Sequence, residues 1–149
     1  MVKRKSLKAS TCPVARGMEA IGDCWSMLII RDAMLGKKRF GEFHKSLGIA
    51  KNILSTRLRG LVDDGLLKLE PAGDGGAYQD YVLTEKGRAV FPIMIALRQW
   101  AEDYAFTPGE ETNIMVDRQS GQRIGRLELY AADGRLLGYG DTTIKPATA

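Results

Sequence analysis

The sequence predicts a mainly α-helical chain of 149 residues with a small β component, an α+β fold. Apolar residues recur at helical spacing through most of residues 12–104, with glycines between the periodic stretches. A glycine-rich turn at residues 73–76 separates two short apolar and aromatic runs, which is typical of a β-hairpin. Beyond Pro108 the helical periodicity ends and short alternating segments follow, so we expect a small β appendage there.

The first two helices are predicted from a proline and from apolar periodicity. Pro13 suits the opening turn of a helix that we expect to end near Gly22. The second helix, at residues 25–35, is apolar on several sides and is therefore expected to lie in the core, with Gly36 as its stop.

A short third helix at residues 40–47, a turn at Gly48 and a fourth helix at residues 50–64 come next. Two helices joined by a tight turn that contains glycine form the outline of a helix-turn-helix. Strands predicted at residues 66–70 and 78–83 follow directly and would form a β-hairpin wing. The order of elements therefore predicts a winged helix-turn-helix.

The part of the chain after the wing is predicted as one long helix and the appendage. Thr84 begins a helix that extends to about Tyr104, and Pro92 is expected to kink or restart it. Short strands are predicted at residues 113–116, 125–130 and 136–140, with a hairpin turn at residues 132–135. We therefore divide the chain into a basic flexible arm (residues 1–11), a winged helix-turn-helix domain that ends in the long helix (residues 12–107) and the appendage (residues 108–149).

Charge and hydropathy restrict the kinds of binding partner and the cellular location that we expect. The chain holds 22 Lys and Arg against 18 Asp and Glu, a formal net charge of +4 that suits a polyanionic partner without requiring one. Basic residues cluster in two places: Lys3, Arg4, Lys5 and Lys8, and then Lys37, Lys38 and Arg39. No apolar run approaches the ~20 residues of a membrane span. Polar residues interrupt any secretory signal, so we expect a cytoplasmic protein with no membrane partner.

The fourth helix carries the side-chain types that read double-stranded DNA. If Leu54, Leu58 and Leu61 face the core, the opposite face presents Lys51, Asn52, Ser55, Thr56 and Arg59. Arg and Lys donate to guanine, Asn pairs with adenine, and Ser or Thr contacts bases or phosphates. Because the N-terminal residues of such a helix reach base edges, we predict Lys51, Asn52 and Ser55 as base readers. Arg57 and Arg59 are predicted to lie closer to phosphates, and Arg39 completes the predicted DNA-binding set.

Two alternatives to DNA reading stay open at this stage. Lys51, Asn52 and Arg59 could form only the solvated face of an amphipathic helix. The wing also carries three carboxylates between residues 70 and 80, where a DNA-contacting wing would gain from Lys or Arg. The alternative function is therefore a winged-helix protein-interaction module that does not read DNA.

The sequence resembles the HxlR-type bacterial winged helix-turn-helix regulators over residues 12–104. The segments that carry the resemblance are collinear: CPV at 12–14, IGDCW at 21–25, LIIRD at 28–32, RFGEF at 39–43, LSTRLRGL at 54–61, DGL at 64–66 and YVLTEKGR at 81–88, before Trp100. The resemblance implies a transcriptional regulator that binds a pseudo-palindromic DNA operator as a homodimer. It also implies that the first helix and the long helix meet across a two-fold axis, through Val14, Met18, Ile93, Leu97 and Trp100.

The two cysteines are candidate redox-sensing residues. Cys12 falls where many members of that family carry a cysteine before the proline, and in some of them this cysteine senses oxidants or electrophiles. A thiol just before a helix lies near the positive end of the helix dipole, and Lys8 and Arg16 add positive charge, which favours the reactive thiolate. Cys24, where the family usually has a basic residue, is a candidate resolving thiol. The alternative is that Cys12 lies in the dimer interface and Cys24 is a small core residue.

Catalytic, metal and cofactor sites are not predicted. The single histidine, His44, lies within the helix-turn-helix without evident cysteine or carboxylate partners. The two cysteines lack the spacing of a zinc motif. We therefore expect no enzyme activity, no metal and no cofactor, and keep a small molecule or an oxidant as the candidate effector.

Overall fold

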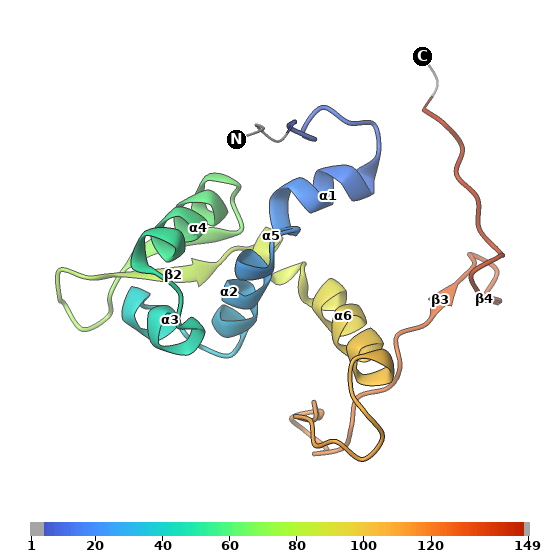
Figure 1. Cartoon of the computed structure of the whole chain (residues 1–149). Helices are drawn as coiled ribbons and strands as arrows, with labels where there is room; N and C mark the ends of the chain where they lie inside the picture. Colours follow the sequence, from blue (N-terminus) through green and yellow to red (C-terminus); the bar gives the residue numbers. More distant parts are fainter. Residues whose placement is uncertain (1–4, 148–149) are drawn as a thin grey trace. The chain divides into compact units, whose positions relative to one another are not determined.

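A computed structural model describes residues 5–147 of the chain (Figure 1). Lys3 and Arg4 of the predicted basic arm lie outside the described residues. The chain divides into two compact units, Met1–Phe91 and Pro92–Ala149. The predicted α+β class is confirmed, because helices dominate and the strands form two small antiparallel sheets. Within the described residues, no helix combines the length and the apolar character that crossing a membrane requires.

The first unit opens with two helices that begin close to where the sequence predicts. α1 (Pro13–Ile21) has Pro13 in its first turn, where a missing N–H leaves no helix hydrogen bond unmade. α2 (Cys24–Met34) is capped by Asp23, whose side chain accepts a hydrogen bond from the Ser26 N–H at 2.8 Å. α2 packs against α1, α3, α4 and the wing, as expected of a core helix.

The helix-turn-helix consists of α3 (Phe40–Leu47) and α4 (Lys51–Asp63), joined through Gly48. Gly48 has a φ of 65°, and its N–H donates to the His44 carbonyl, so the turn uses the left-handed conformation that glycine adopts without strain. The apolar sides of both helices join the core, whose almost fully buried members include Ile29, Ile30, Phe43, Leu54, Leu58 and Leu61. This burial determines which face of α4 is left to solvent.

The wing is an antiparallel hairpin of β1 (Leu67–Pro71) and β2 (Gln79–Leu83), whose bounds lie within one residue of the predicted strands. The Tyr81 N–H of β2 donates at 2.7 Å to the carbonyl of Lys38, in the segment before α3. The wing is therefore held to the helix-turn-helix by a backbone hydrogen bond as well as by side chains.

A close backbone approach forms the base of the wing. Thr84 caps α5 (Glu85–Arg88), because its side-chain oxygen accepts a hydrogen bond from the Gly87 N–H at 3.1 Å. The same hydroxyl donates to the Gly65 carbonyl at 2.5 Å. A Cβ on Gly87 would lie 2.1 Å from the carbonyl oxygen of Leu66, so a side chain cannot be accommodated unless the backbone moves.

α6 (Phe91–Tyr104) is a new helix rather than a continuation of α5. Pro92 explains the restart, because proline fits the first turn of a helix and disrupts a helix interior. Ile95 and Gln99 are its buried residues.

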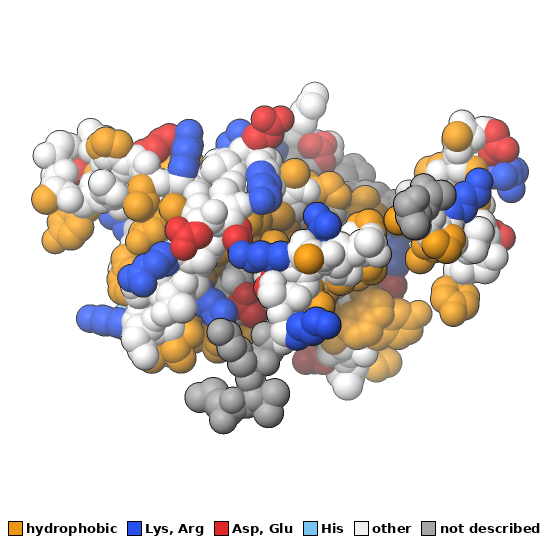
Figure 2. Space-filling view, turned by 90° about the horizontal axis from the view of Figure 1, so that it is seen from above, with side chains coloured by type: hydrophobic (Ala, Val, Ile, Leu, Met, Phe, Trp, Pro, Cys, Tyr) orange, Lys and Arg blue, Asp and Glu red, His pale blue; other side chains and the backbone are white. Residues whose placement is uncertain are grey.

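The appendage has less regular structure than the sequence predicts. The three expected strands shorten to an isolated bridge between Val116 and Arg123 and to the two-residue strands β3 (Leu129–Tyr130) and β4 (Leu136–Leu137). The predicted turn is present, with Gly134 at a φ of 90°. Apolar side chains lie on the surface of this hairpin, at the right of Figure 2. Between residues 108 and 147, no buried face therefore extends the strand pairing that the alternating pattern suggested. The domain boundary at residue 108 stays a prediction.

Candidate nucleic-acid interface

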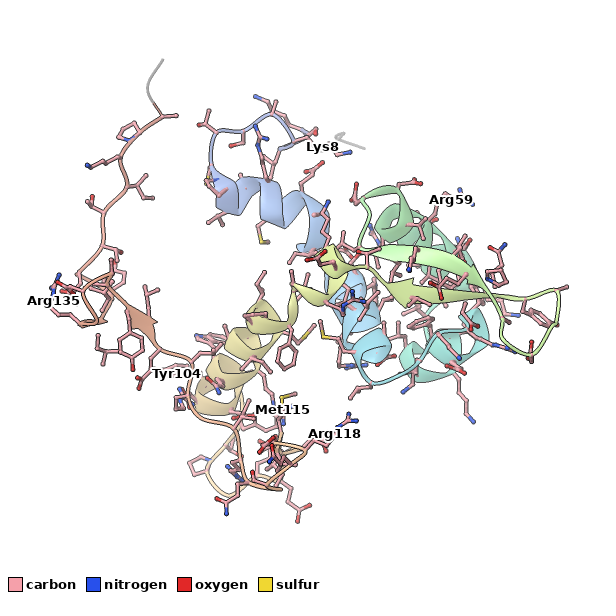
Figure 3. The ribbon with its side chains drawn as sticks, turned by 180° about the vertical axis from the view of Figure 1, so that it is seen from behind. Lys8, Arg59, Tyr104, Met115, Arg118 and Arg135 are labelled. Atoms are coloured by element: carbon pink, nitrogen blue, oxygen red, sulfur yellow. The ribbon has the colours of Figure 1, made fainter. Side chains whose placement is uncertain are left out.

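α4 presents one polar face to solvent. Its leucines Leu54, Leu58 and Leu61 are buried, and each residue exposes at most 1% of its surface to solvent. On the opposite side every predicted contact residue is exposed: Lys51, Asn52, Ser55, Thr56 and Arg59 (Figure 3 labels Arg59). The fold therefore brings these five side chains onto one accessible helix face.

The N-terminus of α4 has no side-chain cap, because Ala50 occupies the capping position. The first N–H groups of a helix lack partners within it, and the helix dipole is positive at that end. Lys51 adds a full positive charge there, and Asn52 and Ser55 follow as neutral polar side chains. This end of α4 thus offers hydrogen-bond donors and positive charge to phosphate oxygens.

Internal contacts divide the predicted DNA-binding residues into two groups. Thr56 donates its hydroxyl to the Asn52 carbonyl at 2.8 Å, along the helix. Arg57 Nε lies 3.5 Å from Oδ1 of Asp23, the carboxylate that caps α2. Within residues 5–147, four side chains of the set make no hydrogen bond or ion pair with the rest of the chain: Lys51, Asn52, Ser55 and Arg59.

Arg39 lies at the start of α3 and reaches the wing rather than open solvent. Its guanidinium is 2.7 Å from Asp74 Oδ2 at the wing tip and 3.3 Å from Asp80 Oδ1 on β2. It also lies over the ring of Tyr78, 5.9 Å from the centroid. The hydrogen bond from Arg39, helped by the Gly76 N–H, lowers the pKa of Asp74 below its ordinary value of 3.8. Arg39 therefore fixes the wing against the helix-turn-helix.

The acidic wing is neutralised from within the chain. Glu70 pairs with Lys68 at 2.9 Å, and the buried carboxylate of Asp80 also lies 3.4 Å from Lys38 Nζ. Together with the Arg39 contacts, each carboxylate between residues 70 and 80 has a basic partner. The sequence analysis predicted none of these pairs. The pair of Lys68 and Glu70 had a signal in the sequence, because residues two apart on one strand share a face. The surface charge of the wing is therefore less negative than its composition suggests.

Both cysteines are exposed. Cys12 occupies the capping position of α1, and its N–H donates to the Ser10 hydroxyl oxygen at 3.1 Å. Arg16 Nε donates to the Ser10 carbonyl at 2.6 Å, which holds the preceding segment against the start of α1. Cys24 is the first residue of α2 and its side chain is exposed, so its interpretation as a small core residue is wrong.

The predicted dimer residues are apolar side chains without cover in the single chain. In the first unit Val14 is 72% and Met18 46% exposed, and α1 buries none of its residues. In the second unit Ile93, Leu97 and Trp100 of α6 are each at least half exposed. Each helix therefore carries an apolar surface that a single copy of the chain leaves in water.

Comparison with protein families gives a match to the model described as HxlR-like helix-turn-helix, over residues 20–108. An uncharacterised HTH-type transcriptional regulator of Mycobacterium tuberculosis is 40% identical over 95 residues, which make up 64% of this chain and 60% of that protein. The chain therefore spans about 60% of the length of this relative.

Two solved structures extend the comparison. The candidate transcription factor PA1607 is 52% identical, with a TM-score of 0.91 over 96% of this chain and 100% of that one. The redox regulator HypR, in its reduced form, is 31% identical, with a TM-score of 0.57 over 63% of this chain and 94% of that one. The winged-helix fold is confirmed. The family and these relatives are described as regulators and not as enzymes, which confirms the expectation that the chain is not an enzyme.

Proposed function

The chain belongs to the HxlR-like helix-turn-helix family, as the sequence resemblance predicts, and on that premise we propose that it is a homodimeric, sequence-specific DNA-binding transcriptional regulator. The observation that carries the proposal is the exposed face of α4, where four polar or basic side chains have no partner among the described residues. Its location is the cytoplasm, and its partners are double-stranded DNA and a second copy of itself.

The α4 face supports a division of roles in the major groove. Lys51, Asn52 and Ser55 lie at the uncapped end of α4 and read base edges, while Arg59 lies two turns further on and meets phosphate. Thr56 and Arg57 keep a supporting role, because each already contacts another group of the chain. Arg39 reaches DNA only where a phosphate competes with its two wing carboxylates.

Dimerisation follows from the exposed apolar surfaces of α1 and α6. A homodimer covers Val14, Met18, Ile93, Leu97 and Trp100, whose exposure favours association in water. Two α4 helices related by a two-fold axis then read half-sites about one helical turn, ~34–36 Å, apart. The operator is accordingly pseudo-palindromic. Residues 12–107 form this DNA-binding and dimerisation domain, with residues 1–11 as a basic arm and residues 108–149 as an appendage.

Cys12 is the proposed oxidant or electrophile sensor. Its support is threefold: the thiol is exposed, it lies at the N-terminus of α1, and HypR is a redox regulator. Cys24 is exposed as well and is the candidate resolving thiol. Oxidation at the start of α1 acts on DNA affinity by changing the spacing of the two α4 helices.

Fluorescence anisotropy with duplex DNA from the region flanking the gene tests the main proposal. We expect a dissociation constant of about 10⁻⁸–10⁻¹¹ M for a specific site. The logarithm of the affinity should fall steeply with the logarithm of salt concentration. Genome-wide mapping of bound DNA should return a pseudo-palindrome. Weak, salt-insensitive binding and no enriched sequence would instead favour the protein-interaction module.

The sensor is tested by repeating the DNA titration after treatment with peroxide or diamide. The expected result is a changed affinity in the unmodified protein and an unchanged affinity in Cys12→Ser. Cys24→Ser separates the two thiols, because it should alter only the oxidised state that needs a second thiol. Equal affinities for the treated and untreated protein would remove Cys12 from the mechanism.

A further inference from the structure

We infer that the second unit contains a binding site for a small organic anion, namely a carboxylate with a compact apolar body. The site is a cavity of about 180 Å³ between α6 and the segment that folds back beside it. Its lining combines three arginines and three apolar side chains: Arg98, Arg123 and Arg126, with Ile114, Met115 and Ile124. Figure 3 labels Met115 and, further along the same segment, Arg118.

Hydrogen bonds hold the walls of the cavity in place. Gln99 of α6 is 7% exposed; its amide donates to the Gly125 carbonyl at 3.0 Å and accepts from the Leu127 N–H at 2.8 Å. The two sides of the folded segment join where the Ile124 N–H donates to the Met115 carbonyl at 3.3 Å. Asp117 closes the turn between them, because its carboxylate accepts from two backbone N–H groups. A buried amide that clamps the backbone in this way fixes the folded segment against α6.

The charges at the cavity are unequal, and the excess is positive. Arg126 has Asp103 as its partner at 2.5 Å, whereas Arg123 has no ion pair within residues 5–147. Glu102 Oε1 lies 2.8 Å from Arg98 Nε but outside hydrogen-bonding geometry, which leaves that buried N–H unsatisfied. Once Asp103 is assigned to Arg126 and Glu102 to Arg98, one guanidinium of the lining, that of Arg123, is left without a carboxylate within residues 5–147. A bound anion would supply the negative charge that this guanidinium group lacks.

The apolar part of the lining decides the class of anion. Ile114, Met115 and Ile124 favour a hydrocarbon surface, which inorganic phosphate does not have. The cavity is smaller than the roughly 300–1,000 Å³ of sites for drug-sized ligands. A single aromatic ring that carries a carboxylate matches this size and this mixture of charge and apolar surface.

Binding of the anion does not depend on DNA reading, but its regulatory effect rests on the proposed function. Arg98 and Glu102 lie on α6, the helix whose Leu97 and Trp100 belong to the proposed dimer surface. A carboxylate that pairs with Arg98 competes with Glu102 for it, and so acts on that helix.

Isothermal titration of the full-length protein with benzoate, without DNA, tests the site. Benzoate should bind saturably, and benzamide, which keeps the ring without the charge, should not. Inorganic phosphate should bind more weakly than benzoate. Arg123→Gln should weaken benzoate binding by about tenfold or more, the effect of one charged hydrogen bond. Arg118→Gln is the matched control, because Arg118 is an exposed arginine of the same segment outside the cavity lining.

The inference would be overturned by no saturable benzoate binding, by equal binding of benzamide, or by equal losses in Arg123→Gln and Arg118→Gln. Phosphate binding as tight as benzoate would also overturn it, since the site would then recognise charge alone. Thermal unfolding of both variants checks that they fold, and Met115→Ala gives a second, uncharged change in the cavity that should weaken benzoate. A second titration measures DNA affinity with and without benzoate. If benzoate binds but leaves the DNA affinity unchanged, the regulatory role is contradicted and the binding site itself is not.

Discussion

The α4 face and the wing both carry charged groups but differ in what those charges contact. Lys51 and Arg59 on α4 have no ion pair within residues 5–147. On the wing, by contrast, Arg39 pairs with both Asp74 and Asp80, and Lys38 also pairs with Asp80; both basic residues belong to the segment before α3. The comparison shows that composition alone does not give the charge that a surface offers to a partner. What matters is the charge that remains after internal pairing.

The largest expected effect comes from removing the unpaired charges of α4. The double variant Lys51→Ala, Arg59→Ala should lose roughly 100-fold in affinity for operator DNA, because two contacts of about 1–3 kcal/mol each disappear. Anisotropy at several salt concentrations measures this loss and should show a flatter salt dependence. Lys68→Ala, which removes a wing charge paired with Glu70, is the control and should change affinity little. Equal losses in both variants would abolish the distinction between the two regions.

Arg39→Gln should affect stability more than DNA binding. The change leaves Asp80, which is 6% exposed, with Lys38 as its remaining cationic partner. We expect the free energy of unfolding to fall, because a buried carboxylate loses a charged donor. Urea unfolding measures this change, with the exposed Lys45→Gln as the control. A variant of unchanged stability but strongly reduced DNA affinity would make Arg39 a direct DNA contact.

Asp74→Asn should produce a smaller effect of opposite sign on DNA binding. The variant removes one negative charge from the wing tip and releases the Arg39 guanidinium from a 2.7 Å contact. Affinity for non-specific DNA should rise by a factor of about three, and the salt dependence should steepen. Asp133→Asn, which breaks an exposed pair with Arg135 in the appendage, is the matched control. A fall in affinity would show that the wing tip must stay paired to fit DNA.

The smallest expected effect is a pH dependence of the wing-tip pair. Arg39 lowers the pKa of Asp74 in the folded state, so protonation of this carboxylate opposes folding. The stabilisation is fully present above the ordinary pKa of 3.8 and is lost as the pH falls through the lowered value. The difference in unfolding free energy between the unmodified protein and Asp74→Asn should therefore shrink in acid. A difference that stays constant from pH 6 to the acid limit would contradict this assignment.

Local signals predicted the helices well. Pro13, Gly36 and Gly48 mark helix ends in the sequence, and the structure has the corresponding boundaries within one or two residues. The α4 face was also predictable, because burial of one leucine stripe exposes the residues opposite to it.

Contacts between distant segments were not predictable in the same way. Arg39 and Asp74 are 35 residues apart, and Arg57 and Asp23 pair across two helices, so no periodicity reveals either contact. The strands of the appendage were overpredicted because alternation signals a strand only where one face is buried. The clamp made by Gln99 was missed for a related reason, since a single glutamine on a helix gives no sign of the backbone that it will hold.

The joint at Gly87 has a consequence for how freely this regulator can be altered. The Leu66 carbonyl occupies the place where any side chain at position 87 would begin. Any altered wing must therefore return the hairpin to that junction, in addition to keeping the contact of Asp74 with Arg39 at the tip. A graft that exchanges the wing between related proteins should succeed when it keeps residues 65–67 and 83–87 together, and should fail when it cuts between them.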